Sequence, residues 1–183
     1  EAACVMAGNG IPVRLFDALR PTPELSFAVR EYGCIAGINV TASHNPAKYN
    51  GYKAYGSVGC QVTADMADGI LDEIKSIDIF TGVKKMDFEE GMKQGLIEYI
   101  GEETVNAFLD DVYKESLIDD ASNLKLVYTP LNGAGKVCVT RILDRIGIKD
   151  VTIVPEQSEP DGNFPTCPYP NPEFREALQK GLE

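Results

Sequence analysis

The most constraining feature of the sequence is a nearly unbroken apolar run at positions 34–42, which ends directly at Ser43, His44, Asn45 and Pro46. A short apolar run without polar alternation is typical of a β-strand that is covered on both faces. We therefore expect an α/β fold with this strand at the centre of a sheet. The polar cluster would then lie on a loop at the carboxyl edge of the sheet, where α/β proteins bind their ligands.

Weaker patterns before and after this run predict the other elements of the first part of the chain. Alternating residues indicate strands at 11–16, 51–55 and 96–100. The turn Arg20-Pro21-Thr22-Pro23, with Thr22 as the N-cap and Pro23 at the first helical position, predicts a helix through about residue 32. Two further helices are expected to have core faces, formed by Met66, Ile70, Leu71, Ile74 and Ile77 in one and by Val105, Phe108, Leu109 and Val112 in the other.

The pattern restarts after a polar segment at 119–123, which we interpret as a linker. A strand at 124–129, a helix at 137–146 and a strand at 151–155 form a βαβ unit, which favours parallel pairing of its strands. A proline-rich loop over 156–172 follows, and a helix begins at about 173. These boundaries predict a first domain at 1–120 and part of a second domain at 121–183.

Composition and charge exclude several classes of partner. With 44% apolar residues among 183, the chain can form a packed core, and its net charge of −11 argues against a nucleic acid or an anionic membrane as partner. It contains no apolar run of the roughly 20 residues that cross a bilayer, and its acidic opening lacks the basic start of a signal peptide. We therefore expect a cytoplasmic protein.

The charges are unevenly distributed along the chain. The acidic excess lies between residues 65 and 120, whereas residues 43–53 contain His44, Lys48 and Lys53 and no acid. Such a cationic segment suits either a small anion or simple solvation.

Neither a zinc site nor a nucleotide-binding loop is expected. The five cysteines are scattered without C-x-x-C spacing, and there is one histidine. The glycine-rich turn at 132–136 ends in Lys136, but Pro130 and Val137 stand where the phosphate-binding P-loop has glycine and Ser/Thr. The dinucleotide fingerprint also fails, because Cys138 occupies the position of its third glycine. We interpret the turn as a connection from strand to helix.

The cluster after the apolar run has a physical logic of its own. Pro46 restricts the backbone that precedes it, and Asn45 tolerates the unusual backbone angles of a tight turn. Ser43 would then be held out toward solvent. From turn chemistry alone, such a cluster is either a structural turn or a site.

Six segments resemble one known family. T-A-S-H-N-P at 41–46 with Y-N-G-Y-K at 49–53 is similar to the phosphoserine loop of the α-D-phosphohexomutases, the phosphoglucomutase/phosphomannomutase family. G-C-Q at 59–61 and R-P-T-P at 20–23 resemble further motifs of its first domain. P-D-G-N-F-P at 160–165, with N-P-E at 171–173, resembles a segment of its second domain. The matches occur in the family's order, and they imply a mixed-sheet α/β domain I followed by part of an α/β domain II.

The resemblance implies a phosphoryl-transfer cycle. Phosphorylated Ser43 would give its phosphate to a hexose 1- or 6-phosphate, and would then take back the other phosphate from the hexose 1,6-bisphosphate. Mg²⁺ would contact the phosphoserine oxygen, so that Ser43 is its ligand through the phosphate. Transfer of this kind depends on positioning and charge neutralisation, which suits a serine beside cations.

The same resemblance assigns roles to individual residues. Lys53 corresponds to the family's general acid/base, although a solvent-facing strand lysine is the alternative. His44 corresponds to an assisting histidine, or else it only stabilises the turn. Asn45 is expected to shape the loop, Lys48 receives no role, and the residues that bind the sugar are not identified.

Parts of the family pattern are absent from the sequence. The G-T-S-G-[LI]-R segment of domain I, the D-G-D-x-D metal site, the G-E-x-S-G-H sugar loop and the R-x-S-G-T-E-P phosphate loop are missing. One phosphoserine loop does not supply the several oxygen ligands that Mg²⁺ prefers. We therefore expect an inactive fragment, with domain I lacking its N-terminal segment.

Several functions remain open. The expected activity is interconversion of hexose 1- and 6-phosphates with glucose favoured, whereas phosphomannomutase and phosphopentomutase relatives share the loop. A serine hydrolase would need a base aimed at Ser43, and His44, as its immediate neighbour, is poorly placed for that role. A non-catalytic fragment that binds sugar phosphates is the alternative of another class. In every case the expected partners are small sugar phosphates.

Overall fold

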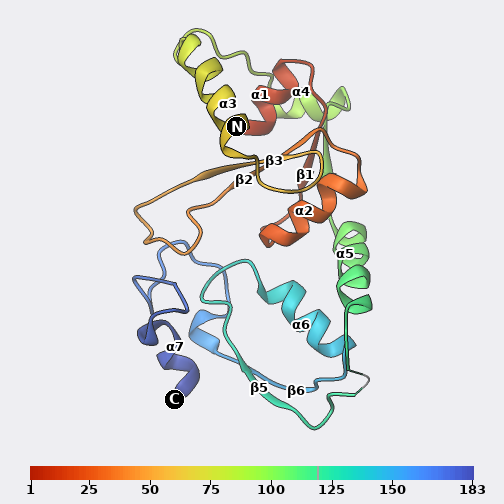
Figure 1. The fold of residues 1–183 in the computed structure, drawn as a ribbon, viewed down its shortest axis with the longest axis vertical. Helices are drawn as coiled ribbons and strands as arrows, with labels where there is room; N and C mark the ends of the chain where they lie inside the picture. Colours follow the sequence, from red (N-terminus) through yellow and green to blue (C-terminus); the bar gives the residue numbers. More distant parts are fainter. Residues whose placement is uncertain (119) are drawn as a thin grey trace. The chain divides into compact units, whose positions relative to one another are not determined.

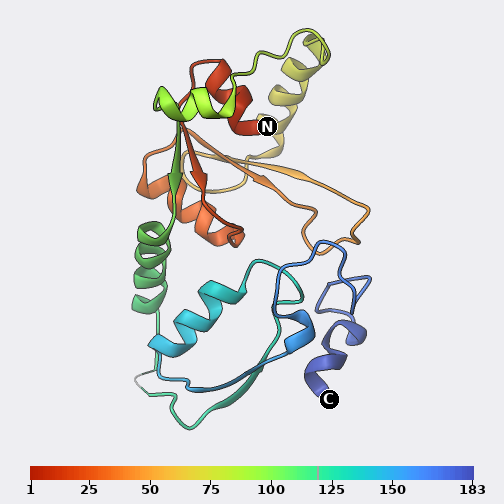
Figure 2. The same ribbon diagram turned by 180° about the vertical axis from the view of Figure 1, so that it is seen from behind.

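The computed structural model describes residues 1–118 and 120–183, and these form two compact units (Figures 1 and 2). The first unit comprises residues 1–19 and 61–104, and the second comprises 20–60 and 105–183. Asp119, the first residue of the predicted linker, lies outside the described residues. The predicted division into domains at 1–120 and 121–183 stays a prediction.

The first unit is built on a pair of parallel strands. Its elements are α1 (Ala2–Gly8), β1 (Val13–Phe16), α3 (Ala64–Ser76), α4 (Phe88–Lys93) and β4 (Ile97–Ile100). β1 pairs with β4 from Val13↔Ile97 to Phe16↔Ile100. Ala3 and Ala7 of α1 are buried together with Ile97 of β4, and this cluster, with Met92 of α4 packed against it, forms the core of the unit. The strands predicted at 11–16 and 96–100 are thus confirmed, with slightly later starts.

Helix α3 is exposed along its whole length. The apolar residues predicted as its core face are each about half exposed: Met66, Ile70, Leu71, Ile74 and Ile77. The prediction of a core face was therefore wrong for this helix. Helical spacing shows that a helix has an apolar side, but it does not show whether the chain contains an element to cover that side.

The second unit begins with a helix on a two-stranded antiparallel sheet. It contains α2 (Thr22–Glu31), β2 (Ala36–Val40) and β3 (Tyr52–Gly56), paired from Ala36↔Gly56 to Val40↔Tyr52. α2 packs so closely on β2 that a Cβ at Gly37 would lie 2.6 Å from Val29 Cγ2. The helix starts one residue earlier than predicted, with Pro21 as its N-cap, because the Thr22 hydroxyl accepts a hydrogen bond from Asn39 Nδ2 (2.7 Å) instead.

The apolar run at 34–42 was expected to be covered on both faces, and this expectation was wrong. Only Gly37 is buried in β2, whereas Ile35 is 80% exposed and Val40 is 60% exposed. Ala36, Ile38 and Val40 occupy the face opposite α2, since alternate residues of a strand point to opposite faces. The apolar pattern therefore predicted the position of the strand correctly, but it predicted more burial of its faces than the structure has.

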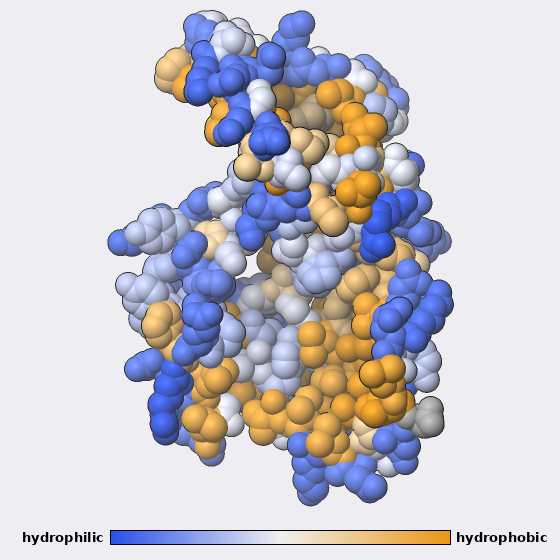
Figure 3. Space-filling model, viewed as in Figure 1, coloured by the Kyte–Doolittle hydropathy of each residue, from blue (hydrophilic) through white to orange (hydrophobic). Residues whose placement is uncertain are grey.

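The remainder of the second unit is a βαβ arrangement. β5 (Lys125–Tyr128) and β6 (Asp150–Ile153) pair in parallel, with α6 (Lys136–Arg145) between them, so the predicted βαβ unit is confirmed. A short 3₁₀ helix (Pro155–Gln157) and α7 (Arg175–Leu182) follow. α5 (Glu102–Lys114) buries Val105 and Leu109 against Cys138 of α6, with Phe108 partly buried beside them. The predicted core face is therefore confirmed at these three positions, but Val112 is 37% exposed. Figure 3 shows apolar surface over β5 and β6, where Leu124 and Val127 are exposed.

Candidate functional site

The loop between β2 and β3 carries Ser43 in a strained conformation. Ser43 has φ of 58°, a left-handed value that costs a non-glycine residue on the order of 1–3 kcal/mol. Its N–H donates to Thr41 Oγ1 (3.0 Å), and the N–H of Asn45 donates to the Ala42 carbonyl (3.1 Å). The unusual backbone angle was expected at Asn45, and the structure places it at Ser43. Ser43 is exposed, so its hydroxyl is open to a ligand.

The base of this loop is closed by backbone contacts. The N–H of Thr41 donates to the Gly51 carbonyl (3.0 Å), one residue beyond the last pair of β2 and β3. A Cβ on Gly51 would lie 2.2 Å from the Thr41 carbonyl oxygen, so only glycine fits at this position without a shift of the backbone. The loop that presents Ser43 is thus fixed at its root by Thr41 and Gly51.

His44 lies beside the Ser43 hydroxyl. Its Nδ1 is 3.3 Å from Ser43 Oγ, which is long for a hydrogen bond but close enough for proton exchange after a small movement. Both side chains are exposed. Within the described part of the chain, no carboxylate is hydrogen-bonded to the ring, as a Ser-His-Asp triad would require. The arrangement therefore does not favour a serine hydrolase.

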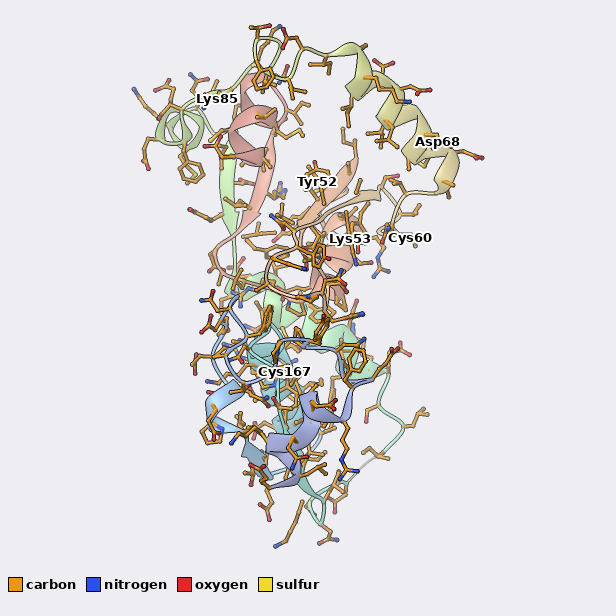
Figure 4. All side chains as sticks on the ribbon, turned by 90° about the vertical axis from the view of Figure 1, so that its left-hand side faces the viewer. Tyr52, Lys53, Cys60, Asp68, Lys85 and Cys167 are labelled. Atoms are coloured by element: carbon orange, nitrogen blue, oxygen red, sulfur yellow. The ribbon has the colours of Figure 1, made fainter. Side chains whose placement is uncertain are left out.

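Lys53 lies on the α2 side of the sheet. It stands opposite Asn39 in the β2–β3 register, and directly opposed residues share one face of a sheet. Asn39 in turn contacts Thr22 at the start of α2. Lys53 is half-buried, whereas Tyr52, on the other face, is 60% exposed (both are labelled in Figure 4). The structure thus brings Ser43 and His44 together and places Lys53 further along the hairpin.

A cavity of about 390 Å³ opens at the Ser43 loop. Its wall is formed by the loop and by one turn that follows β6, with the lining residues Thr41, Ala42, Ser43, Asn45, Pro46, Ala47, Lys48, Tyr49, Asn50, Gly162 and Phe164. Neither His44 nor Lys53 is among these described lining residues. The volume suits a small ligand with a few polar groups.

Lys48 gives this cavity its charge. It is the single charged residue among the described lining residues, and its ammonium lies 5.2 Å from the centroid of the Tyr49 ring in a cation–π contact. A positive wall without an opposing acid favours an anionic ligand. Sequence reasoning gave Lys48 no role, although its place in the cationic segment was visible.

The turn that contains Gly162 and Phe164 was also missed as part of the site. Its residues were recognised as a family motif, but no pattern in the sequence indicated that they would reach a loop more than a hundred positions away. Phe164 has φ of 47°, which is rare for a bulky side chain and not evident from the sequence.

Lys136 of the glycine-rich turn is engaged elsewhere. Its ammonium pairs with the carboxylate of Glu159, and this hydrogen bond lowers the pKa of Glu159 below its usual value. A Cβ on Gly135 would lie 2.8 Å from the Tyr128 hydroxyl, so this glycine allows the turn to approach β5 closely. These contacts support the interpretation of the turn as a structural connection.

A buried polar cluster fixes α2 beneath the site. Glu24 is fully buried, with Arg20 Nε 3.8 Å from its Oε1 and the Cys138 thiol donating to its Oε2 (3.4 Å). Burial, followed by the negative charge of Glu24, raises the pKa of Cys138 to about 11, so the thiol is protonated at neutral pH. The cluster ties α2 to α6, and α2 in turn packs on β2, the strand that leads to Ser43.

The described residues do not form a metal site by themselves. No group of three or more His, Cys, Asp or Glu side chains among residues 1–118 and 120–183 could hold an ion. A phosphate on Ser43 would offer oxygen ligands to Mg²⁺, but one such group falls short of the octahedral set that Mg²⁺ prefers. In the same described residues, no helix is both long and apolar enough to span a bilayer.

Comparisons with known proteins agree with the fold. The family described as phosphoglucomutase/phosphomannomutase, alpha/beta/alpha domain I matches residues 1–79, and domain II of the same family matches residues 106–183. The chain therefore belongs to the phosphoglucomutase/phosphomannomutase family, and its α/β fold is that of the family's domains I and II.

Individual relatives show how much of such a protein the chain represents. It is 39% identical to a phosphoglucomutase of Staphylococcus saprophyticus, covering 100% of this chain and 33% of that protein. It is 36% identical to a phosphoribomutase of Saccharomyces cerevisiae, over 88% of this chain and 28% of the relative. A solved structure assigned as a phosphomannomutase from Thermus thermophilus superposes with a TM-score of 0.72 at 25% identity. The match covers 94% of this chain and 36% of that one. The chain thus spans about a third of its curated relatives.

Proposed function

We propose that this chain is the phosphoryl-carrying part of a mutase that interconverts hexose 1-phosphate and hexose 6-phosphate, with glucose as the favoured sugar. The observation that carries the proposal is an exposed, strained Ser43 at the wall of a cavity where the one charged residue of the described lining is a lysine. Relatives named phosphoglucomutase support the same activity. The strained turn holds the serine hydroxyl outward, where a phosphate can be attached and removed.

In each half of the reaction, one bond to phosphorus breaks and another forms. The bond from phosphorus to Ser43 Oγ breaks, a bond to a sugar hydroxyl oxygen forms, and the sugar hydroxyl gives up its proton while Oγ gains one. The resulting hexose 1,6-bisphosphate turns over and returns its other phosphate to Ser43. His44, at 3.3 Å from Oγ, is placed to exchange a proton with the serine, and Lys53 is the proposed acid/base toward the sugar.

Electrostatics is the main demand of such a transfer. Lys48 supplies positive charge at the cavity, and bound Mg²⁺ would neutralise further charge on the phosphate oxygens. Because Ser43 contributes a metal ligand only through its phosphate, we infer that this chain alone does not turn over substrate. The five free cysteines suit a reducing compartment, and we propose a cytoplasmic location.

The proposal is tested by exposing the purified chain to glucose 1,6-bisphosphate and Mg²⁺. We expect one phosphoryl group on the wild-type chain by intact mass, located at Ser43 by peptide mapping, and none on Ser43→Ala. Ser57→Ala, which removes another exposed serine of the same unit, should behave like wild type. Conversion of glucose 1-phosphate to glucose 6-phosphate should be absent in all three.

Two outcomes would count against this function. A chain that takes up no phosphoryl group but still binds glucose 6-phosphate would be the non-catalytic sugar-phosphate-binding fragment. Equal labelling of Ser43→Ala would place the acceptor elsewhere. Replacing the donor by mannose or ribose bisphosphates compares glucose with the mannose and pentose alternatives, of which the second is suggested by the phosphoribomutase relative.

A further inference from the structure

Two loops from different sheets meet at the Ser43 cavity. One is the β2–β3 loop, and the other is the turn at 161–164, which contributes Gly162 and Phe164. We propose that this turn is a second substrate-binding element of the site, in which Phe164 contacts the sugar of a sugar phosphate whose phosphate lies at the Ser43 loop. The identity of this ligand rests on the proposed function.

Backbone strain is concentrated around this cavity. Among the described residues, the non-glycine positions with left-handed φ are Ser43, Leu131, Asn132 and Phe164. Ser43 and Phe164 line the cavity, while Leu131 and Asn132 belong to the segment that anchors the 161–164 turn. Strained backbone persists only where its surroundings hold it, and it gathers at ligand sites. The distribution therefore marks the turn as part of the site.

Asn132 fixes the start of the turn. Its carbonyl accepts a hydrogen bond from the N–H of Asp161 (3.0 Å), and its side-chain Nδ2 donates to the Glu159 carbonyl (2.8 Å). Within the turn, Asp161 Oδ1 accepts from the N–H of Asn163 (2.8 Å), and its carbonyl accepts from the N–H of Phe164 (3.1 Å). These bonds determine the direction in which Phe164 leaves the backbone.

Gln157 connects this anchor to the sheet. It is fully buried, its Oε1 accepts from Thr129 Oγ1 (2.7 Å) and its Nε2 donates to Thr166 Oγ1 (3.0 Å). Its carbonyl accepts from the N–H of Asn132 (2.9 Å). Since β5 and β6 are parallel, Thr129 and Gln157 follow the carboxyl ends of both strands at one edge, which is the edge where α/β sheets bind ligands.

The chemistry of the cavity suits a sugar phosphate. Lys48 and the amide-bearing residues Asn45 and Asn50 bring charge and hydrogen-bonding groups to the lining, and Phe164 adds an aromatic residue to it. A sugar ring has apolar C–H faces between its hydroxyl groups, and an aromatic side chain buries such faces at little entropic cost. Inorganic phosphate alone would use the loop and leave Phe164 without a contact.

This difference gives the test. Dissociation constants for glucose 6-phosphate and for inorganic phosphate are measured on the 183-residue chain by amide NMR titration, which also reports whether each variant is folded. We expect Phe164→Ala to weaken the binding of glucose 6-phosphate about tenfold, because the ring would contact only the sugar. The binding of inorganic phosphate should change less than about twofold. Phe164→Tyr should retain wild-type affinity. Tyr169→Ala, which removes an exposed aromatic ring of the same segment, is the matched control and should change neither constant.

Several results would overturn the proposal. These are no detectable binding of glucose 6-phosphate by the wild type, an unchanged constant in Phe164→Ala, or equal weakening of both ligands, which would indicate a merely structural role. If Phe164→Ala is unfolded, Phe164→Leu tests the proposal instead, because leucine fills the space without an aromatic face. The Phe164→Leu variant should bind glucose 6-phosphate more weakly than Phe164→Tyr, and equal affinities would overturn the proposal.

The outcome is separate from that of the phosphoryl-transfer experiment. Phosphorylation of Ser43 with no effect of Phe164 on binding would leave the proposed function standing and remove this inference. Selective weakening in Phe164→Ala without any phosphorylation of Ser43 would support the binding element and refute phosphoryl transfer by this chain.

Discussion

Replacing Gly51 by alanine should disturb the loop that presents Ser43. The added Cβ would lie 2.2 Å from the Thr41 carbonyl oxygen, 3.3 Å from its carbonyl carbon and 3.6 Å from Ala42 Cα. All three atoms belong to the backbone, so no side-chain rotation relieves the contact. The carbonyl oxygen must retreat by about 1 Å to reach an ordinary van der Waals separation. This movement strains the hydrogen bond from the Thr41 N–H to the Gly51 carbonyl.

The magnitude follows from two opposing effects. Overpacking costs typically about 1–3 kcal/mol, whereas exchanging glycine for alanine gains about 0.4–1 kcal/mol by restricting the unfolded chain. We therefore expect Gly51→Ala to lower the free energy of unfolding by about 1–2 kcal/mol. Gly56→Ala is the matched control, because Gly56 ends β3, the strand that Gly51 directly precedes, and a Cβ added there would meet no heavy atom within 4 Å. That variant should be neutral or slightly stabilised.

Urea unfolding and amide exchange measure these effects. With a slope of about 2 kcal/mol/M, the midpoint of Gly51→Ala should fall by about 0.5–1 M relative to Gly56→Ala. The amide of Thr41 should exchange faster in Gly51→Ala, and phosphorylation at Ser43 should decrease. Equal midpoints and equal Thr41 exchange in the two variants would refute the argument that the close approach of Gly51 and Thr41 holds the loop.

Two further predictions concern β5 and α6. Gly135→Ala should lower the free energy of unfolding by about 1 kcal/mol, because its Cβ would lie 2.8 Å from the Tyr128 hydroxyl. Adding Tyr128→Phe to this variant should restore part of the loss in a double-mutant cycle, and additive effects would contradict the clash. For Cys138, the folded pKa of about 11 exceeds the ordinary thiol value of 9.0, so the folded state holds its proton more tightly and stability should fall as pH rises between these values. The free energy of unfolding, measured from pH 8 to about 11, should decline less steeply in Cys138→Ser than in the wild type. The serine keeps a hydrogen-bond donor to Glu24 and does not ionise in this range. Identical slopes in the two proteins would exclude the Cys138 thiol as a cause of the pH dependence.

The sequence predicted most elements of the fold, but it did not predict what covers them. The strands and helices of the βαβ unit were found because their periodicity is local. α3 and α5 have similar apolar stripes, yet α5 buries Val105 and Leu109 and α3 buries none of its residues, because burial depends on the elements nearby. α4 was missed, although Asp87 accepts a hydrogen bond from the N–H of Glu90 in a pattern typical of a helix start.

The candidate site was also predicted only in part, because sequence patterns are local and some of its contacts are not. Ser43 and its neighbours were located because they are contiguous and follow a strand. Phe164 was not, because its place in the cavity depends on a left-handed backbone and on the buried contacts of Gln157 and Asn132, which link positions distant in the sequence. The position of Lys53 beside Asn39 depends on strand register, which the alternation of residues 51–55 did not specify.

The contact between Glu24 and Cys138 has a consequence for exchanging parts between relatives. These two residues are 114 positions apart, yet a buried hydrogen bond joins their helices. A hybrid gene whose crossover falls anywhere between them would combine a carboxylate from one parent with whatever side chain the other parent holds at position 138. Unless that side chain donates a hydrogen bond, the hybrid would bury a charge with one donor fewer. Family shuffling should therefore inherit α2 and α6 as one block.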